Sequence, residues 1–146
     1  MSYPPLPGLV TDESDFLSDH AAVQLQEKLL AFQVRTEHTL AVYIVPRHGR
    51  GTIKQWCLGA FNAWTVGRKG YDDGAVLYIF TAEGDRDRGF WWLTIGYGLE
   101  RALSDREVTA IIMKNASPSL DVGDEDGAVT SVVDAIIGRI EAHEGR

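Results

Sequence analysis

Four carboxylates, those of Asp72, Asp73, Glu100 and Asp105, lie in two glycine-containing segments near the middle of the chain. Calcium takes six to eight oxygen ligands, and carboxylates and backbone carbonyls are the groups that proteins offer it. Glycine permits the close approach of the backbone to a ligand because it has no side chain. These residue types therefore indicate a site for a hard divalent cation, provided that the fold brings the two segments together.

The apolar pattern predicts the elements that must do this, in the order helix, strand, helix, strand, strand, helix, helix. Continuous apolar runs, typical of strands covered on both faces, occupy 40–45 and 75–80, and a third strand is expected at 90–95. Apolar residues at helical spacing predict helices from Ser18 to near His38, from Ile53 to Trp64, from Ser104 to just before Pro118, and from Val129 to Ile140. Ser18 is the expected N-cap of the first helix, and Ser104 begins a capping box.

The strand order decides which loops meet. Strands 40–45 and 75–80 flank a helix and should lie parallel, whereas 75–80 and 90–95 should form an antiparallel hairpin. The loop at 67–74 and the segment at 96–105 then lie at the same end of the sheet, which brings the four carboxylates together. Because apolar strands need cover on both faces, we expect an α/β fold, a three-layer αβα sandwich with a short mixed central sheet.

Each of the four carboxylates also has a purely structural explanation. Asp105 would be favourable in the first turn of a helix. Asp72 and Asp73 are typical of a turn, and Glu100 could pair with Arg101 or Lys69. Charged loops are usually solvated, so the residues alone favour these explanations over a metal site.

Composition limits the remaining classes of function. The chain has 146 residues, which we interpret as a single domain over 1–146, with an extended segment at 1–17 that contains prolines 4, 5 and 7. A formal charge of −7 argues against a nucleic-acid surface and is compatible with cation binding. No apolar run approaches the roughly 20 residues of a membrane span, so no transmembrane segment is predicted. The compartment is not readable: the sequence as it stands suggests the cytoplasm, and a longer parent protein could be exported or membrane-anchored.

Several motifs occur along the chain in a recognisable order and spacing: Val10-Thr11-Asp12, Gly67-Arg68-Lys69-Gly70, Asp72-Asp73-Gly74, Ile95-Gly96-Tyr97-Gly98-Leu99-Glu100 and Gly123-Asp124 with Gly127. Together they resemble the TPM domain family, named after a thylakoid lumen protein of photosystem II repair and its relatives. The resemblance implies a three-layer αβα sandwich, binding of a divalent cation that is usually calcium, and acid phosphatase activity in some members. It also implies frequent export or membrane anchoring.

Three departures from the family pattern concern the candidate sites. Asp73 stands where the family often has Asn, and the segment 47–50 replaces a more neutral loop. The loop at 124–126 is wholly acidic where an aromatic residue is common.

Asp124 and Asp126 belong to that acidic loop and form a second candidate metal site. An EF-hand is excluded, because aligning Gly127 to its required glycine puts Val122 at the first ligand position and Val133 at the position of the bidentate Glu. Acidic residues directly before a helix also stabilise its N-terminus. We therefore interpret this loop first as a helix cap and second as a metal site.

Phosphatase chemistry would depend on the metal, which would polarise the phosphoryl oxygen and activate water. Asp72 and Lys69 are weak catalytic candidates, and Arg68 and Lys69 are candidates for phosphate contact. Calcium is a mediocre Lewis acid, so such activity should be weak. The run Arg47-His48-Gly49-Arg50 follows a strand as in histidine phosphatases, but the second His and Arg of that family have no counterpart in a matching context, and we interpret it as a coincidence.

Three functions remain open at this stage. The first is a calcium-binding interaction or assembly module that docks on a membrane protein or a protein complex. The second is a weak metal-dependent acid phosphatase, and the third is a structural domain without catalysis. The substrate, the partner and the oligomeric state are not readable from the residues.

Overall fold

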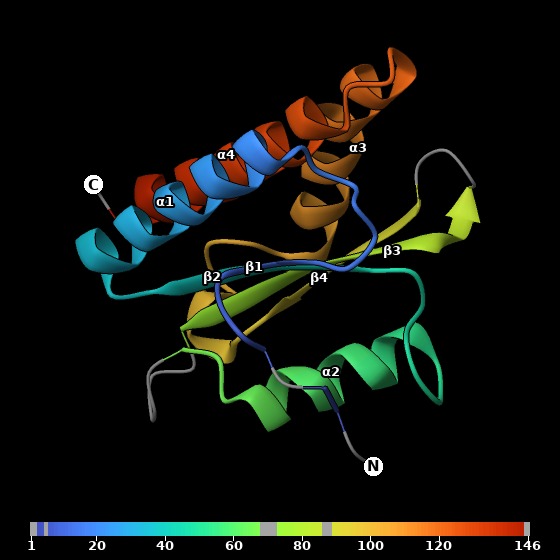
Figure 1. The fold of residues 1–146 in the computed structure, drawn as a ribbon. Helices are drawn as coiled ribbons and strands as arrows, with labels where there is room; N and C mark the ends of the chain where they lie inside the picture. Colours follow the sequence, from blue (N-terminus) through green and yellow to red (C-terminus); the bar gives the residue numbers. More distant parts are fainter. Residues whose placement is uncertain (1–2, 5, 68–72, 86–88, 145–146) are drawn as a thin grey trace.

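The computed structural model describes residues 3–4, 6–67, 73–85 and 89–144. A central four-stranded sheet separates α2 on one side from α1, α3 and α4 on the other (Figure 1). The elements in chain order are β1 Val10–Asp12, α1 Asp19–Thr36, β2 Thr39–Val45, α2 Ile53–Trp64, β3 Gly74–Asp85, β4 Gly89–Ile95, the 3-10 helix Tyr97–Leu99, α3 Asp105–Asp121 and α4 Glu125–His143. The predicted three-layer αβα sandwich is confirmed.

The sheet has the spatial order β1-β2-β3-β4 and is mixed. β2 is parallel to β1 and β3, whereas β3 and β4 are antiparallel, as the hairpin pattern predicted. β2 and β3 are the inner strands and are buried along their apolar runs, because helices cover both of their faces.

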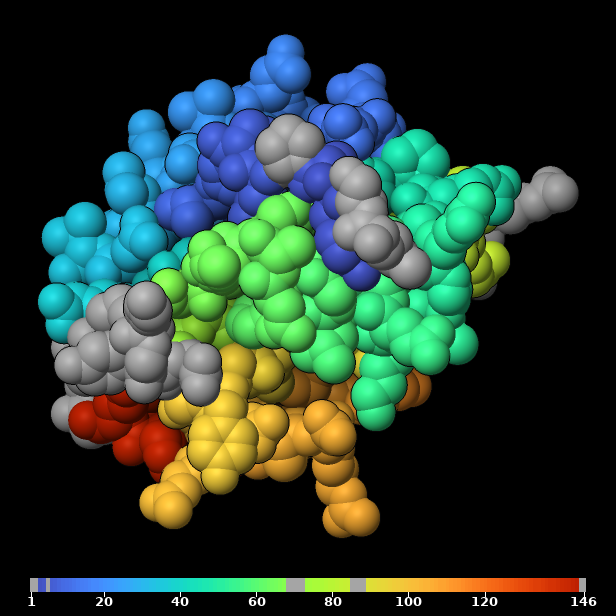
Figure 2. Space-filling model, turned by 90° about the horizontal axis from the view of Figure 1, so that it is seen from below, coloured from blue at the N-terminus to red at the C-terminus, as the bar shows by residue number. Residues whose placement is uncertain are grey.

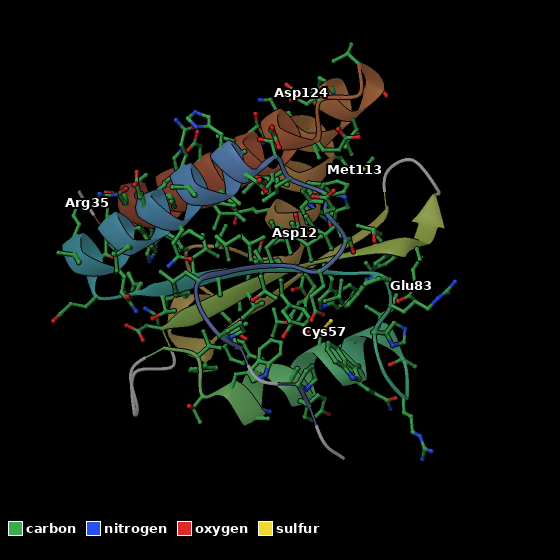
Figure 3. All side chains as sticks on the ribbon, in the orientation of Figure 1. Asp12, Arg35, Cys57, Glu83, Met113 and Asp124 are labelled. Atoms are coloured by element: carbon green, nitrogen blue, oxygen red, sulfur yellow. The ribbon has the colours of Figure 1, made fainter. Side chains whose placement is uncertain are left out.

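Alternation along the strands divides the interior into two cores. Leu40, Val42 and Ile44 of β2 face α1, α3 and α4, where aliphatic side chains dominate. Ala41, Tyr43 and Val45 face α2, where the packing is largely aromatic. Cys57 of α2 points into this second core (Figure 3), and its burial raises the pKa of its thiol to about 12.

Two features differ from the sequence expectations. Val10–Asp12 forms a fourth, edge strand, which the pattern did not reveal because three residues carry no measurable alternation. It is held by the Val42 amide, which donates to Leu9 O at 2.8 Å, and by the Val10 amide, which donates to Gln26 Oε1 at 3.1 Å.

The prediction that α3 ends before Pro118 is wrong, because the helix continues to Asp121 with Pro118 inside it. A proline so close to the end disturbs only the last turns, and Leu120 beyond it still packs against the aliphatic core. The first helix ends at Thr36, close to the expected position. Among the described residues, no helix combines the length and apolar character required to cross a membrane.

Candidate cation-binding site

The two carboxylate-bearing segments lie at one end of the sheet, as the strand order predicted. β2 and β3 begin side by side there, with Thr39 opposite Gly74. β4 ends beside the start of β3, and the Gly96 amide donates to Gly74 O at 2.7 Å. Loop 67–74 and segment 96–105 therefore leave the sheet next to each other.

The described ends of loop 67–74 are closely packed, and glycine makes this possible. Gly67 has a φ of +92°, and a Cβ on it would lie 2.6 Å from the Gly74 amide nitrogen. A Cβ on Gly74 would lie 2.7 Å from the backbone of Val66. Both positions thus exclude a side chain, which explains two of the glycines in the motif. Arg68, Lys69 and Asp72, predicted for phosphate contact, catalysis and metal binding, lie outside the described residues.

Glu100 and Asp105 share a cavity of about 330 Å³. Its other lining residues come from β4 and from the two residues just before α3: Leu93, Ile95, Leu103 and Ser104. Both carboxylates are exposed to solvent, so an ion could reach them. Asp105 also occupies the first turn of α3, which fits its structural explanation as well.

Ser104 orders the rim of this cavity. Its hydroxyl is the N-cap of α3: it accepts from the Glu107 amide at 3.3 Å and donates to Glu107 Oε1 at 3.1 Å. These bonds hold the pKa of Glu107 below its usual value, with the Ser104 hydrogen bond as the main cause. The predicted capping box contact on the Ser104 side chain is confirmed, and it fixes the start of α3 beside Glu100.

Asp73 has a different environment from the two cavity carboxylates. Asp73 is 3% exposed, and its Oδ2 lies 3.0 Å from Nδ1 of the buried His38. The opposite ring nitrogen, Nε2, lies 2.5 Å from Oε2 of Glu144, which follows the last turn of α4. The His38 ring therefore connects the loop before β3 to the C-terminal end of α4.

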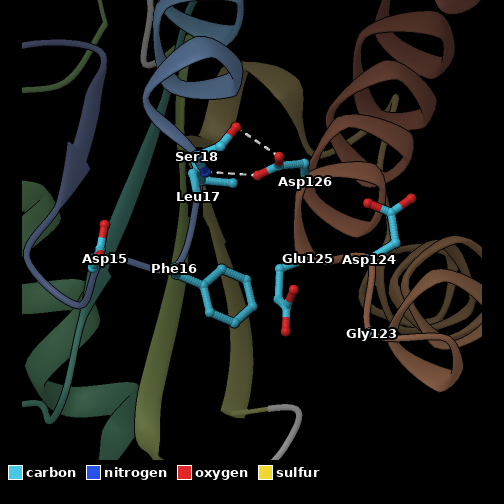
Figure 4. Close-up of a pocket in the computed structure, with 8 residues that line it drawn as sticks. All are labelled: Asp15, Phe16, Leu17, Ser18, Gly123, Asp124, Glu125 and Asp126. Atoms are coloured by element: carbon cyan, nitrogen blue, oxygen red, sulfur yellow. Dashed lines mark hydrogen bonds between the residues drawn. The ribbon is translucent and has the colours of Figure 1, made fainter.

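Asp124 caps α4, as the interpretation of this loop as a helix cap predicts, whereas Asp126 does not. Asp124 Oδ1 accepts from the Gly127 amide at 2.9 Å and caps α4. Asp126 instead serves α1, because it accepts from the Ser18 amide at 2.9 Å and from the Ser18 hydroxyl at 2.7 Å (Figure 4). The first turns of α1 and α4 are thereby tied together.

These residues border a pocket of about 310 Å³ that carries four carboxylates, from Asp15, Asp124, Glu125 and Asp126. The carboxylates of Figure 4 do not converge on one point. Across the whole described part of the chain, no three His, Cys, Asp or Glu side chains are grouped so that they could hold one metal ion.

The loop with Arg47 and His48 lies at the other end of the sheet, after β2. The His48 amide donates to Glu83 Oε2 at 2.8 Å, and His48 Nε2 lies 3.1 Å from Glu83 Oε1. Glu83 lies at the far end of β3 from the candidate cavity (Figure 3). The imidazole is thus engaged by a carboxylate of its own chain.

Sequence reasoning missed three residues that organise this fold: His38, Glu144 and Asp12. Asp12 accepts backbone hydrogen bonds from residues 14, 16 and 17, and it shapes the turn before α1. A signal for His38 existed, since it directly precedes a strand parallel to the one that Asp73 precedes. Glu144 lies 106 residues from His38, and no local pattern could pair them.

Known proteins that resemble this chain have the same architecture, a mixed sheet in an αβα sandwich. A family model described as the TPM domain matches residues 10–139. The chain therefore belongs to the TPM domain family. No curated protein matches it.

Three solved structures share the fold. The N-terminal domain of a protein from P. gingivalis has 25% identity and a TM-score of 0.77, with 92% of this chain and 83% of that one covered. The BA42 protein from the psychrophilic bacterium Bizionia argentinensis has 9% identity and a TM-score of 0.69, with coverages of 90% and 86%. The N-terminal domain of the cg2496 protein from Corynebacterium glutamicum has 13% identity and a TM-score of 0.63, with coverages of 94% and 82%.

Proposed function

We propose that this domain binds a divalent cation, calcium by preference, at the sheet end where Glu100 and Asp105 meet. The observation that carries the proposal is that these two exposed carboxylates line one cavity with residues of β4. Two carboxylates from different elements, held close by a sheet and a capped helix, provide the negative charge that such an ion needs.

The chemistry of the donor set favours a hard cation. The cavity offers carboxylate oxygens and a hydroxyl, which suit calcium or magnesium better than softer metals. Calcium needs six to eight oxygens, so backbone carbonyls, water and the neighbouring loop would supply the remainder. Asp72 would be the further carboxylate from that loop. Asp73 would contribute mainly by positioning, because its Oδ2 already contacts His38.

An interaction role follows from what surrounds the cavity. Tyr97 is 79% exposed and lies three residues before Glu100. A large aromatic ring in water is a common anchor for a protein partner. A bound cation would order the segment that carries Tyr97, so cation binding and partner binding would be linked. The domain would then act as a cation-dependent interaction module within a larger assembly.

Thermal melting in 10 mM calcium and in EDTA tests the proposal. With a dissociation constant of about 0.1 mM, calcium would stabilise the domain by about 2.7 kcal/mol. That corresponds to a rise in melting temperature of roughly 5–11 °C. The rise should be lost in Glu100→Gln and Asp105→Asn, and it should persist in Asp124→Asn, which removes a carboxylate from the other acidic pocket.

Three outcomes would change the account. The absence of any calcium-dependent shift in the wild type would contradict the proposal. A shift that Asp124→Asn abolishes, and that Glu100→Gln leaves intact, would move the site to the pocket between α1 and α4. Hydrolysis of a phosphate monoester at acid pH that disappears with Glu100→Gln would add phosphatase activity to the same site.

A further inference from the structure

Positive and negative charges are distributed unevenly along this chain. Residues 38–71 contain no Asp or Glu, so all 21 carboxylate side chains lie outside this segment. The same segment holds five of the 14 Lys and Arg residues. It includes α2, which lies on the opposite side of the sheet from α1, α3 and α4 (Figure 1). In a protein with a formal charge of −7, the layer that contains α2 therefore carries a local excess of positive charge.

Three of these cations are exposed around the start of α2: Arg47, Arg50 and Lys54. Leu58 is 49% exposed and follows Lys54 by one turn, so both side chains lie on one side of the helix. We call these four residues the α2 basic surface. The green atoms of α2 occupy the middle of the face seen in Figure 2. The other two cations of the segment lie outside the described residues: Arg68 and Lys69.

Helix stability does not account for these cations. The N-terminal end of a helix carries positive partial charge, so a Lys or Arg is unfavourable there. The first turn of α2 contains no acidic residue, and Lys54 lies within it. Thr52 already caps the helix, because its hydroxyl accepts from the Gln55 amide at 3.1 Å. Within the described part of the chain the three cations form no ion pair, so their charge is open to a negatively charged partner.

Two carboxylates border this surface without neutralising it. Glu83 is already engaged, because its Oε1 lies 3.1 Å from Nε2 of His48. Glu13 directly follows β1, and its amide donates to Ile44 O at 2.8 Å. Both carboxylates thus belong to the sheet, whereas α2 after Lys54 carries no charged residue.

We propose that the α2 basic surface docks on a bilayer that contains anionic phospholipids. Such a bilayer presents a broad negative surface that attracts Lys and Arg. A single helix on the outside of the sheet fits a flat partner of this kind, with Leu58 entering the interface beside the cations. The carboxylates outside residues 38–71 are repelled by the same lipids, so the charge distribution orients the domain with α2 toward the bilayer.

An acidic protein is the other class of partner that positive charge would attract. Protein interfaces depend on aromatic or Arg anchors that fill pockets at their centre. The exposed residues of α2 include no aromatic side chain: they are Lys54, Gln55, Leu58, Asn62 and Ala63. This composition fits a layer of lipid headgroups better than the core of a protein interface.

The expected strength of binding follows from the number of cations. Each Lys or Arg close to an anionic bilayer strengthens binding about fivefold, so three give roughly 100-fold. Salt screens this attraction beyond about 10 Å at 0.1 M and beyond about 3 Å at 1 M. Binding should therefore be clear at about 0.1 M sodium chloride and lost at about 1 M.

Cosedimentation of the full chain with lipid vesicles measures this binding. Phosphatidylcholine vesicles with roughly 30% phosphatidylserine should bind the wild type about 100-fold more strongly than vesicles of phosphatidylcholine alone. EDTA is present throughout, so the result does not depend on the proposed cation site. Glu100→Gln should accordingly bind the anionic vesicles as the wild type does.

Two triple variants with the same net charge provide the matched comparison. The variant with Arg47→Gln, Arg50→Gln and Lys54→Gln should bind the anionic vesicles at least about 20-fold more weakly. The control changes three exposed cations of α3 and α4, on the other side of the sheet: Arg106→Gln, Lys114→Gln and Arg139→Gln. It removes the same charge and should change binding less than about threefold, because these residues lie away from the bilayer.

Asn62→Lys tests the same surface by a gain of binding. Asn62 is exposed and follows Leu58 by one turn on the same side of α2. A fourth cation at this position should strengthen binding about fivefold. Far-UV circular dichroism checks that each variant is folded, and Asn62→Lys provides the test if the α2 triple variant does not fold.

Absence of wild-type binding to the anionic vesicles would overturn the proposal and would leave the surface to an acidic protein. Equal binding by the two triple variants would also overturn it, as would binding that persists at about 1 M salt. An Asn62→Lys variant that binds no better than the wild type would contradict the placement of α2 against the lipid.

Discussion

Replacing His38 by leucine should destabilise the domain through loss of the link between Asp73 and Glu144. Leucine keeps much of the buried volume but removes both ring nitrogens. Hydrogen bonds to charged groups contribute about 1.5–3 kcal/mol when they are buried. The contact with Asp73 is of this kind, because the two side chains are 8% and 4% exposed.

The contact with Glu144 should contribute less, because that side chain is 25% exposed and partly screened by water. The expected loss for His38→Leu is therefore about 1.5–3 kcal/mol in the free energy of unfolding. It corresponds to a fall in melting temperature of roughly 3–12 °C for a domain of this size.

Urea titration at constant pH measures this loss, and His20→Leu is the control because His20 is exposed on α1. The control should change the free energy of unfolding by less than about 0.5 kcal/mol. A double-mutant cycle with Asp73→Ala should give a coupling above about 0.5 kcal/mol, since the residues are in contact. A change for His38→Leu no larger than that of the control, or strict additivity in the cycle, would refute the reasoning.

Two further predictions concern α4 and the core beneath α2. Gly138→Ala should raise the free energy of unfolding, measured by urea titration, by up to about 1 kcal/mol. Alanine is the better helix former, and the space around a Cβ at this position is open. A loss of stability would show that Gly138 has a packing role. Cys57 is fully buried and burial raises the pKa of its thiol to about 12, so it should react with an aromatic disulfide reagent at pH 8 only when the protein opens. Rapid reaction of the native protein, at the rate of an unfolded control, would contradict this.

The sequence predicts those parts of the fold that depend on extended hydrophobic patterns. The run at 75–80 identified the most buried strand, and the spacing from Ile53 to Trp64 identified a whole helix. The position of Gly96 beside the start of β3 followed from strand order alone, because strand order fixes which segments share a sheet end.

The features that the sequence did not predict depend on contacts between residues that are distant in sequence. β1 exists because backbone and side-chain groups of β2 and α1 hold it, so a strand of three residues leaves no pattern of its own. Asp126 looked like a cap for its own helix and instead accepts hydrogen bonds from Ser18, the N-cap of α1, 108 residues away. The pairing of His38 with Glu144 was hidden for the same reason, since local sequence carries no information on which distant carboxylate a histidine will meet.

Calcium titration of the uniformly ¹⁵N-labelled protein, followed by ¹H–¹⁵N NMR spectra, tests the central claim most directly. If the cation binds where we propose, saturable shifts will be largest at the amides of Glu100, Ser104 and Asp105, with a dissociation constant near 0.1 mM. Amides of Asp124 to Gly127 will move little. Shifts that are absent at 10 mM calcium, or that are largest at Asp124 to Gly127, would contradict the account.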